Sequence, residues 1–471
     1  MVYSTNQFLL VFLPIVLLGY FALSKLKNFN FQKVFLILAS LFFYGYNNWI
    51  YLLLILLSIL INYVVAHFMQ KSQSKLLLIL GILFNVGLLG YFKYYDFFVS
   101  NVNAIFRTSF VLKNIILPLG ISFFTFQQLS FLISVYKKEE QIHHFFDYCL
   151  FVVFFPQLVA GPIVLYSEMI PQFKDDSRRY FNIDNFCKGL FLFGIGMFKK
   201  TVIADTIALF VDNGFAMTDI GFSAAWITSL SYTFQIYFDF SGYSDMAIGL
   251  GKMFNIDITE NFNSPYQSKS ISEFWRRWHI TLGRALRSYV YFPLGGNRKG
   301  LTRTCFNLLI TFLVSGIWHG ANWTFILWGL LHGVFMVIER LLRDQLEKIP
   351  AMIRTAGTFL ITNALWVLFR AESFSQVLTI YKGMLNVGNI HYSQLQQIAN
   401  DALVNFPAII DIVYVLVIVG ALLAVTFLCK NSTSLYKNFA ITKKTAWITA
   451  MCMILSLIFM SRGSVFIYFN F

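Results

Sequence analysis

The fold is decided by residues 270–338, which read SISEFWRRWHITLGRALRSYVYFPLGGNRKG over 270–300 and contain the run FLVSGIWHGANWTFILWG at 312–329. The first part is rich in arginine, whereas the only ionisable side chains in residues 306–338 are His319 and His332. This apolar part is longer than the roughly 20 residues that one membrane-spanning helix needs. The stretch therefore predicts a basic segment that contains His279, followed by a membrane-embedded segment that contains His319.

The basic segment, residues 270–300, has the pattern of an amphipathic helix. Ser270-Ile271-Ser272-Glu273 has the form of a capping box, which predicts a helix start at Ser270. At 100° per residue one face collects Arg276, Arg277, Arg284 and Arg287, and apolar residues occupy the opposite face. Such a helix lies in a membrane interface, with its arginines among phosphates or facing an anionic ligand. His279 is expected at the seam between the two faces.

The apolar segment, residues 305–339, is expected to break near Gly320, Ala321 and Asn322. Its glycines form two small-xxx-small pairs, Gly316 with Gly320 and Gly329 with Gly333. Small residues at this spacing let another helix or a ligand approach the backbone closely. An ionisable group within a membrane is costly, so His319 is a functional candidate by default.

The composition predicts a polytopic membrane protein. Of the 471 residues, 58% are hydrophobic and 12% are charged, and the mean hydropathy is +0.66. The chain has 36 basic and 22 acidic side chains, but the basic excess lies in short loops, which is typical of membrane topology signals and does not indicate a nucleic-acid partner. The five cysteines stand singly, which predicts neither a disulfide framework nor a metal site.

Apolar runs along the chain predict an all-α protein with roughly 11–13 membrane passages, re-entrant helices included, in a single domain over residues 1–471. Three runs place proline, glycine or polar groups at apparent membrane depth, where irregular backbone is tolerated only inside protein or beside a cavity. These runs, 117–127, 154–166 and 233–254, imply a central chamber. Asp239 and Asp245 in the last run share a helical face only if Gly242 breaks the helix, and they are expected to form ion pairs or cap helix breaks.

Several runs together resemble the membrane-bound O-acyltransferase family, and within it the bacterial alginate and peptidoglycan O-acetyltransferases. They are LPLGISFFTFQ (117–127), FFPQLVAGPI (154–163), QIYFDFSGYSDMAIGLGKMF (235–254), NFNSPYQSKSISEFWRRWHITL (261–282), YFPLGGNRKG (291–300) and SGIWHGANWTFILWG (315–329). The resemblance extends from about Asn6 to the C-terminal FIYFNF. It implies a multi-helix bundle with a funnel or tunnel, and transfer of an acyl group to a hydroxyl.

The resemblance also implies the candidate residues. The family's signature histidine corresponds to His319 in WHGANW, and a second polar residue, often Asn or Asp in eukaryotic members, corresponds to His279 in WRRWH. Acyl transfer from a thioester to a hydroxyl needs a base, and a neutral His319 has the acceptor nitrogen for that role. His279 could orient this base, hold the donor or act as a second acid, or it could be an interfacial residue without chemistry.

Candidate donor-binding residues are Arg276, Arg277, Trp278, Arg284 and Asn322. Guanidinium groups match phosphate oxygens, so the arginines could bind coenzyme A, although anionic lipid headgroups would attract them equally. For Trp278, a packing or interface anchor is the favoured interpretation over contact with a ligand. His332 is expected to be structural or solvated.

These observations predict an O-acetyltransferase in the inner or plasma membrane of a bacterium. It would move acetyl from a cytoplasmic donor, acetyl-CoA, toward a cell-envelope or exported polysaccharide, with no bound cofactor or metal. The family branch implies a separate extracytoplasmic esterase-like partner. Two alternatives remain at this point: D-alanyl transfer to teichoic acid, and a transporter or flippase, for which broken helices and intramembrane aspartates are equally natural.

Overall fold

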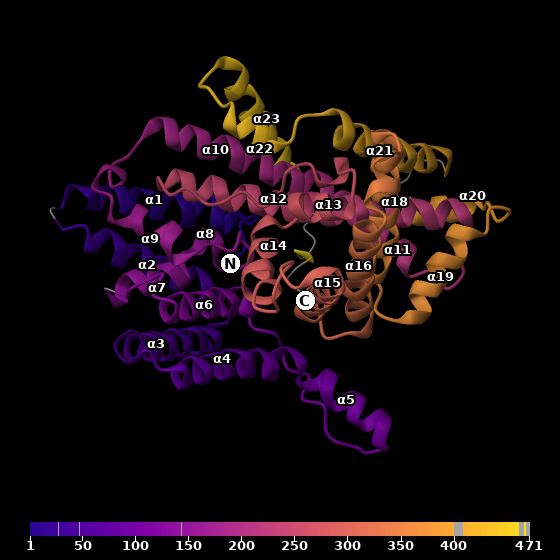
Figure 1. Ribbon diagram of the computed structural model, residues 1–471. Helices are drawn as coiled ribbons and strands as arrows, with labels where there is room; N and C mark the ends of the chain where they lie inside the picture. Colours follow the sequence, from indigo (N-terminus) through magenta and orange to yellow (C-terminus); the bar gives the residue numbers. More distant parts are fainter. Residues whose placement is uncertain (27, 47, 143, 400–407, 461–465, 468–471) are drawn as a thin grey trace. The chain divides into compact units, whose positions relative to one another are not determined.

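The computed structural model of the protein describes residues 1–26, 28–46, 48–142, 144–399, 408–460 and 466–467 (Figure 1). Within these ranges the regular secondary structure is helical and contains no strand. The residues form two compact units. Unit 1 consists of Met1–Ile195, Tyr243–Glu260 and Phe439–Met451, and unit 2 consists of Gly196–Gly242, Asn261–Asn438 and Cys452–Phe471. The all-α fold is confirmed, whereas the single domain stays a prediction.

Unit 1 contains most of the N-terminal helices: α1 (Leu13–Ala22), α2 (Asn30–Gly45), α3 (Trp49–Ser72), α4 (Lys75–Leu89), α5 (Tyr95–Phe106), α6 (Ile121–Tyr136), α7 (Phe145–Val153), α8 (Phe155–Leu158) and α9 (Tyr166–Lys174). Three helices contribute residues to both units: α10 (Ile183–Met197), α12 (Phe222–Met253) and α23 (Lys443–Phe459).

Unit 2 contains the remaining helices: α11 (Asp205–Phe215), α13 (Ile271–Arg277), α14 (Ile280–Leu286), α15 (Gly300–His319), α16 (Trp323–Leu341), α17 (Arg343–Leu346), α18 (Ala351–Arg370), α19 (Phe374–Leu385), α20 (Tyr392–Ala399), α21 (Ala408–Leu428) and α22 (Ser432–Lys437). Short 3₁₀ and π segments extend or connect helices at Gln7–Phe12, Leu23–Lys25, Gly90–Tyr94, Asp176–Arg178, Phe198–Ala204, Pro265–Gln267 and Arg287–Tyr291. Both predicted histidines belong to unit 2.

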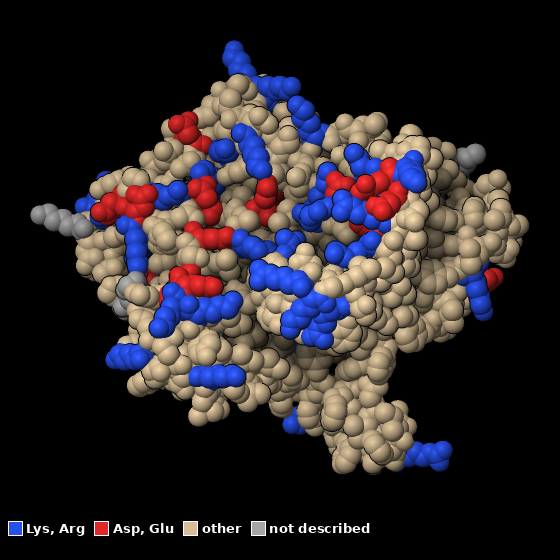
Figure 2. All heavy atoms as spheres, viewed as in Figure 1, with Lys and Arg blue, Asp and Glu red and all other residues tan. Residues whose placement is uncertain are grey.

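Among the described residues, six helices are long and apolar enough to cross a membrane: Gln7–Lys25, Trp49–Ser72, Lys75–Phe106, Gly300–His319, Trp323–Leu341 and Ala351–Arg370. Shorter apolar helices occur at Asn30–Gly45, Ile121–Tyr136 and Ile412–Leu428. Over α4 and α5 the surface in Figure 2 is mainly uncharged, in keeping with contact between these helices and lipid. The protein is therefore a multi-pass membrane protein, and the number of passages stays a prediction.

The glycine-containing run at 233–254 is a regular helix, so a break at Gly242 is not observed. α12 continues through this residue from Phe222 to Met253. A Cβ at Gly242 would lie 2.8 Å from the backbone oxygen of Gly196, and one at Gly249 would lie 2.6 Å from that of Gly189. Gly242 and Gly249 therefore allow α12 to pack closely against α10. The expectation of irregular backbone was wrong because glycine in an apolar helix can mark a close contact with another helix instead of a break.

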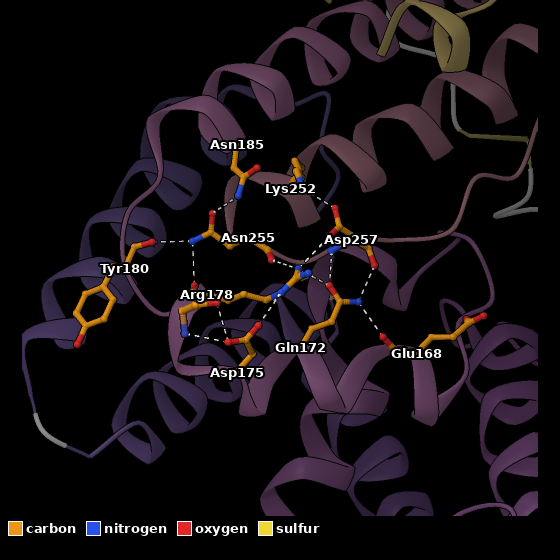
Figure 3. Close-up of polar contacts among 10 residues, drawn as sticks. Glu168, Gln172, Asp175, Arg178, Tyr180, Asn185, Lys252, Asn255 and Asp257 are labelled. Carbon is orange, nitrogen blue, oxygen red and sulfur yellow. Dashed lines mark hydrogen bonds and ion pairs between the residues drawn. The ribbon is translucent and has the colours of Figure 1, made fainter. Parts of the chain in front are cut away.

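A polar network in unit 1 fixes the segment that follows α12 (Figure 3). A single terminal nitrogen of the Arg178 guanidinium, Nη1, donates to the side chains of Gln172 and Asp257 and to the carbonyl of Asn255, at 2.8–2.9 Å. Lys252 donates to the other carboxylate oxygen of Asp257 at 2.6 Å. Burial raises the pKa of Asp257, but the hydrogen bonds and charges of Lys252 and Arg178 outweigh it and leave the pKa below 3.8.

Candidate active site

α15 and α16 form a closely packed pair whose connection carries His319. In unit 2 they lie side by side (Figure 1), and a Cβ at Gly316 would lie 2.4 Å from the carbonyl oxygen of Phe325. A Cβ at Gly329 would lie 2.8 Å from Cα of Gly316. α15 ends at His319 and α16 begins at Trp323, which confirms the predicted break. The small residues therefore allow a neighbouring helix to approach, as their spacing predicted.

His319 is buried among aromatic rings, with 2% of its surface exposed. Its ring centroid lies 5.0 Å from that of Trp328 at an interplanar angle of 90°, and 5.2 Å from that of Phe369 on α18. Edge-to-face contacts of this kind hold a ring in one orientation. His319 is thus the last residue of α15 and is oriented by rings from two other helices.

The same aromatic cluster contains His332, which the sequence analysis expected to be structural or solvated. His332 is fully buried, and its ring lies 4.9 Å from that of Trp328. The indole N–H of Trp275 donates to its Nδ1 at 3.2 Å. The solvated alternative is therefore wrong, and His332 links α13 to α16 in the core of unit 2.

The predicted amphipathic helix is interrupted at its second histidine. α13 ends at Arg277, and α14 begins at Ile280, after His279 adopts a left-handed conformation with φ 45° and ψ 53°. Backbone hydrogen bonds from a distant segment replace the helical ones. Asn263 N–H donates to the carbonyl of Arg277 at 2.9 Å, and Ile280 N–H donates to that of Asn261 at 3.0 Å. Local periodicity predicted one continuous helix, and this expectation was wrong because long-range pairing satisfies the backbone at the break.

The start of α13 agrees with the capping-box pattern in part. The hydroxyl of Ser270 accepts from the backbone N–H of Glu273 at 3.1 Å, so the predicted helix start is confirmed. The carboxylate of Glu273 accepts from the backbone N–H of Lys269 at 2.9 Å, one residue before the position that the motif predicts. It also forms an ion pair with Arg277 at 2.6 Å.

His279 is fully buried, so the expected position at a membrane interface is not observed. Its ring lies 4.7 Å from that of Phe240 on α12 and 6.3 Å from that of Trp318, the residue next to His319. His279 lies between α13 and α14, outside the candidate spans, and burial lowers its pKa to about 3. The imidazole is therefore neutral at physiological pH.

The side chain of Asn261 organises the break around His279. Its Oδ1 lies 3.2 Å from Nδ1 of His279 and accepts hydrogen bonds from both the backbone N–H and the hydroxyl of Thr281, at 3.1 and 2.9 Å. Asn261 itself is buried, with 1% of its surface exposed. One amide oxygen therefore caps the start of α14 and contacts the candidate histidine.

A buried charge cluster in unit 2 accounts for Asp239. Lys200 forms ion pairs with Asp205 at 2.7 Å and with Asp239 at 2.9 Å, and all three are almost fully buried. The other carboxylate oxygen of Asp239 accepts from the backbone N–H of Ile467 at 2.8 Å. Asp239 thus forms a structural ion pair, as expected, and its partner lies in the π-helical segment Phe198–Ala204.

Comparison with known proteins identifies the family. The model of the membrane-bound O-acyltransferase family matches residues 98–373, a range that contains His279 and His319. The chain belongs to this family. A peptidoglycan O-acetyltransferase of Helicobacter pylori is 44% identical, with 100% of this chain and 98% of the relative covered. A probable alginate O-acetylase AlgI of Pseudomonas aeruginosa is 40% identical, with 84% of this chain and 77% of the relative covered.

A teichoic acid D-alanyltransferase of Bacillus subtilis is 30% identical over a shorter region, with 47% of this chain and 59% of the relative covered. The chain is therefore an acyltransferase enzyme, and the match to the Helicobacter pylori protein over nearly its full length supports a membrane O-acetyltransferase.

In this membrane-bound O-acyltransferase the candidate donor-binding residues have different surroundings. Arg276 and Arg287 are exposed, whereas Arg277 and Arg284 are half-buried. Trp278 is buried in the core with 1% of its surface exposed, and stacks on Phe274 at 5.6 Å. This burial favours the packing alternative for Trp278.

Asn322 acts as the N-cap of α16 in the acyltransferase. Its Oδ1 accepts from Thr324 N–H at 3.1 Å, and its amide N–H donates to the carbonyl of Glu372 at 2.9 Å. Both ends of the side chain therefore stabilise the turn that follows His319, which assigns Asn322 a structural contribution.

Sequence reasoning did not single out Asn261 or Thr281 in the acyltransferase. Asn261 precedes the basic segment 270–300 and Thr281 lies within it, 20 residues later, and no periodic pattern relates the two positions. The only signal was the run NFNSPY, which was noted for the family resemblance and not for hydrogen bonding. Contact between these residues and His279 became visible only with the fold.

Proposed function

We propose that this acyltransferase moves acetyl groups from acetyl-CoA on the cytoplasmic side to an extracytoplasmic cell-envelope polysaccharide. The observation that carries the proposal is the match to a peptidoglycan O-acetyltransferase over 100% of this chain and 98% of the relative. That coverage favours peptidoglycan over alginate as the acceptor class. A location in the inner or plasma membrane, and a separate esterase-like partner that receives the acetyl group, are part of the same proposal.

The proposed reaction breaks the thioester C–S bond of the donor and forms a C–O ester bond on the acceptor hydroxyl. His319 takes the hydroxyl proton as attack begins, and the proton then passes to the departing thiolate, which leaves as a free thiol. The burial of His319 between the rings of Trp328 and Phe369, which hold the imidazole in one orientation, supports this role. His279 is the second histidine of the proposed site.

The exposed Arg276 and Arg287 support donor binding from the membrane surface. Guanidinium groups pair with phosphate oxygens, and coenzyme A carries several. Charge reversal at both positions should raise KM for acetyl-CoA with little change in kcat. An unchanged KM would assign these arginines to lipid headgroups.

The test uses sealed vesicles that contain the purified protein, with labelled acetyl-CoA added on one side and label measured in an acceptor on the other. His319→Ala should abolish transfer, while His391→Ala should retain it, because His391 is an exposed histidine outside the aromatic cluster. Equal transfer by the folded His319→Ala protein would refute the assignment. Label movement only from a D-alanyl donor, or solute movement without acetyl-CoA consumption, would support D-alanyl transfer or transport instead.

A further inference from the structure

Asn261 and His279 are held together by a set of hydrogen bonds whose direction can be worked out from chemistry. The backbone N–H of Thr281 can only donate, and it lies 3.1 Å from one terminal atom of the Asn261 amide. That atom must therefore be the oxygen, Oδ1, because an amide nitrogen would present a second donor. The orientation of the Asn261 side chain is thereby fixed.

The same oxygen determines the proton position on His279. Oδ1 of Asn261 lies 3.2 Å from Nδ1 of His279 and can only accept, so Nδ1 must carry the hydrogen. A neutral imidazole has one N–H, so Nε2 of His279 then carries the lone pair. The other tautomer would place two lone pairs opposite each other in a fully buried site, where an unmade hydrogen bond costs about 1–3 kcal/mol.

The backbone supports the same conclusion. His279 holds φ 45°, a left-handed conformation that is uncommon for non-glycine residues. The carbonyl of Asn261 accepts from Ile280 N–H at 3.0 Å, and its side chain accepts from Thr281, so Asn261 binds both residues that follow the histidine. The conformation of His279 and its proton position therefore have a common origin.

We propose that Asn261 is a positioning residue that holds His279 as the Nδ1–H tautomer, so that His279 enters acyl transfer as a hydrogen-bond acceptor through Nε2. This inference rests on the proposed participation of His279 in the reaction. It argues against the role of second acid for His279, because a neutral imidazole in this tautomer cannot donate a proton or a hydrogen bond through Nε2 to a developing oxyanion. Asn261 acts only through His279 and is not itself placed in contact with substrate.

The test compares Asn261→Leu with Asn261→Asp and with the matched control Asn263→Leu. Leucine removes the acceptor at similar volume, whereas aspartate keeps an acceptor oxygen. Asn263 lies two residues further along the same segment, and its side chain contacts Asn431 at 2.9 Å and not a histidine. Each variant is purified, its folding is checked by thermal unfolding, and acetyl transfer from acetyl-CoA is measured as kcat and KM.

We expect Asn261→Leu to lower kcat by about 10- to 100-fold with little change in KM, as for the loss of a partner that orients a functional histidine. Asn263→Leu should retain kcat. The ¹⁵N spectrum of histidine-labelled protein in bilayers, with the His279 signals assigned by His279→Gln, should show Nδ1 protonated in the parent and in Asn261→Asp. It should show a loss of this preference in Asn261→Leu.

The proposal is overturned if folded Asn261→Leu keeps both kcat and the Nδ1–H signal, or if Asn263→Leu loses as much kcat. If Asn261→Leu does not fold, Asn261→Asp decides the question, since a deprotonated Nδ1 in that variant contradicts the assignment. Failure of the proposed function has a different signature. Full transfer by His279→Gln would remove His279 from the reaction while the ¹⁵N spectrum still reported its tautomer.

Discussion

Gly316→Ala tests whether close contact between α15 and α16 positions His319. The added Cβ would lie 2.4 Å from the carbonyl oxygen of Phe325. Carbon–oxygen contacts in proteins lie at about 3.3–3.6 Å, so the two helices must separate locally by about 1 Å. Overpacking of this size destabilises by about 1–3 kcal/mol. Because His319 follows three residues later on α15, a misplacement of about 1 Å should lower kcat on the order of 10²-fold.

The matched control is Gly357→Ala in α18, where an added Cβ meets nothing within 4 Å. Alanine in a helix interior is more stable than glycine by about 0.5–1 kcal/mol, so this variant should unfold at a slightly higher temperature and keep full activity. Both variants are compared by thermal unfolding in detergent and by acetyl transfer in vesicles. A Gly316→Ala protein with the stability and kcat of the parent would refute the link between this helix contact and His319.

Three further predictions concern stability. Lys200→Met should destabilise by about 3–5 kcal/mol because it removes a buried cation that pairs with both Asp205 and Asp239, and thermal unfolding should show partial recovery when both aspartates become Asn. Asp257→Asn should cost less than about 1 kcal/mol near pH 7 because the carboxylate is half-exposed. Because the pKa of Asp257 is lowered in the folded state, the difference in unfolding free energy between the variant and the parent should persist above about pH 4. It should disappear as the pH falls through the folded pKa of Asp257. Ser270→Ala should lower stability by about 1 kcal/mol through loss of the α13 cap, and an unchanged unfolding midpoint would contradict this.

Much of the fold could be predicted because it depends on local patterns. Apolar length indicated the spanning helices, and the small residues around Gly316 and Gly329 indicated a close helix contact. The break after His319 was predicted near Gly320, Ala321 and Asn322, and the structure places it there. Where glycine had two explanations, as at Gly242, the sequence could not separate a helix break from helix packing, and the packing explanation was correct.

The site was predictable only in part, because its geometry depends on contacts between distant segments. His319 and His279 were selected from chemistry and family resemblance, and the structure encloses both in aromatic surroundings. The interruption at Trp278 and His279 was not predictable from periodicity, since Asn261 and Asn263 supply the competing hydrogen bonds. A helical wheel assumes that the helix continues, so it placed His279 at an interface when the residue is buried.

At His279 the left-handed backbone favours one kind of residue for folding stability, and the proposed role in acyl transfer requires another. Glycine or asparagine would relax the φ of 45° more readily than histidine does. A redesign guided by folding free energy alone would therefore select one of them and remove the imidazole. Variants recovered for heat tolerance without selection for activity should accumulate such changes at position 279, whereas joint selection should retain histidine there.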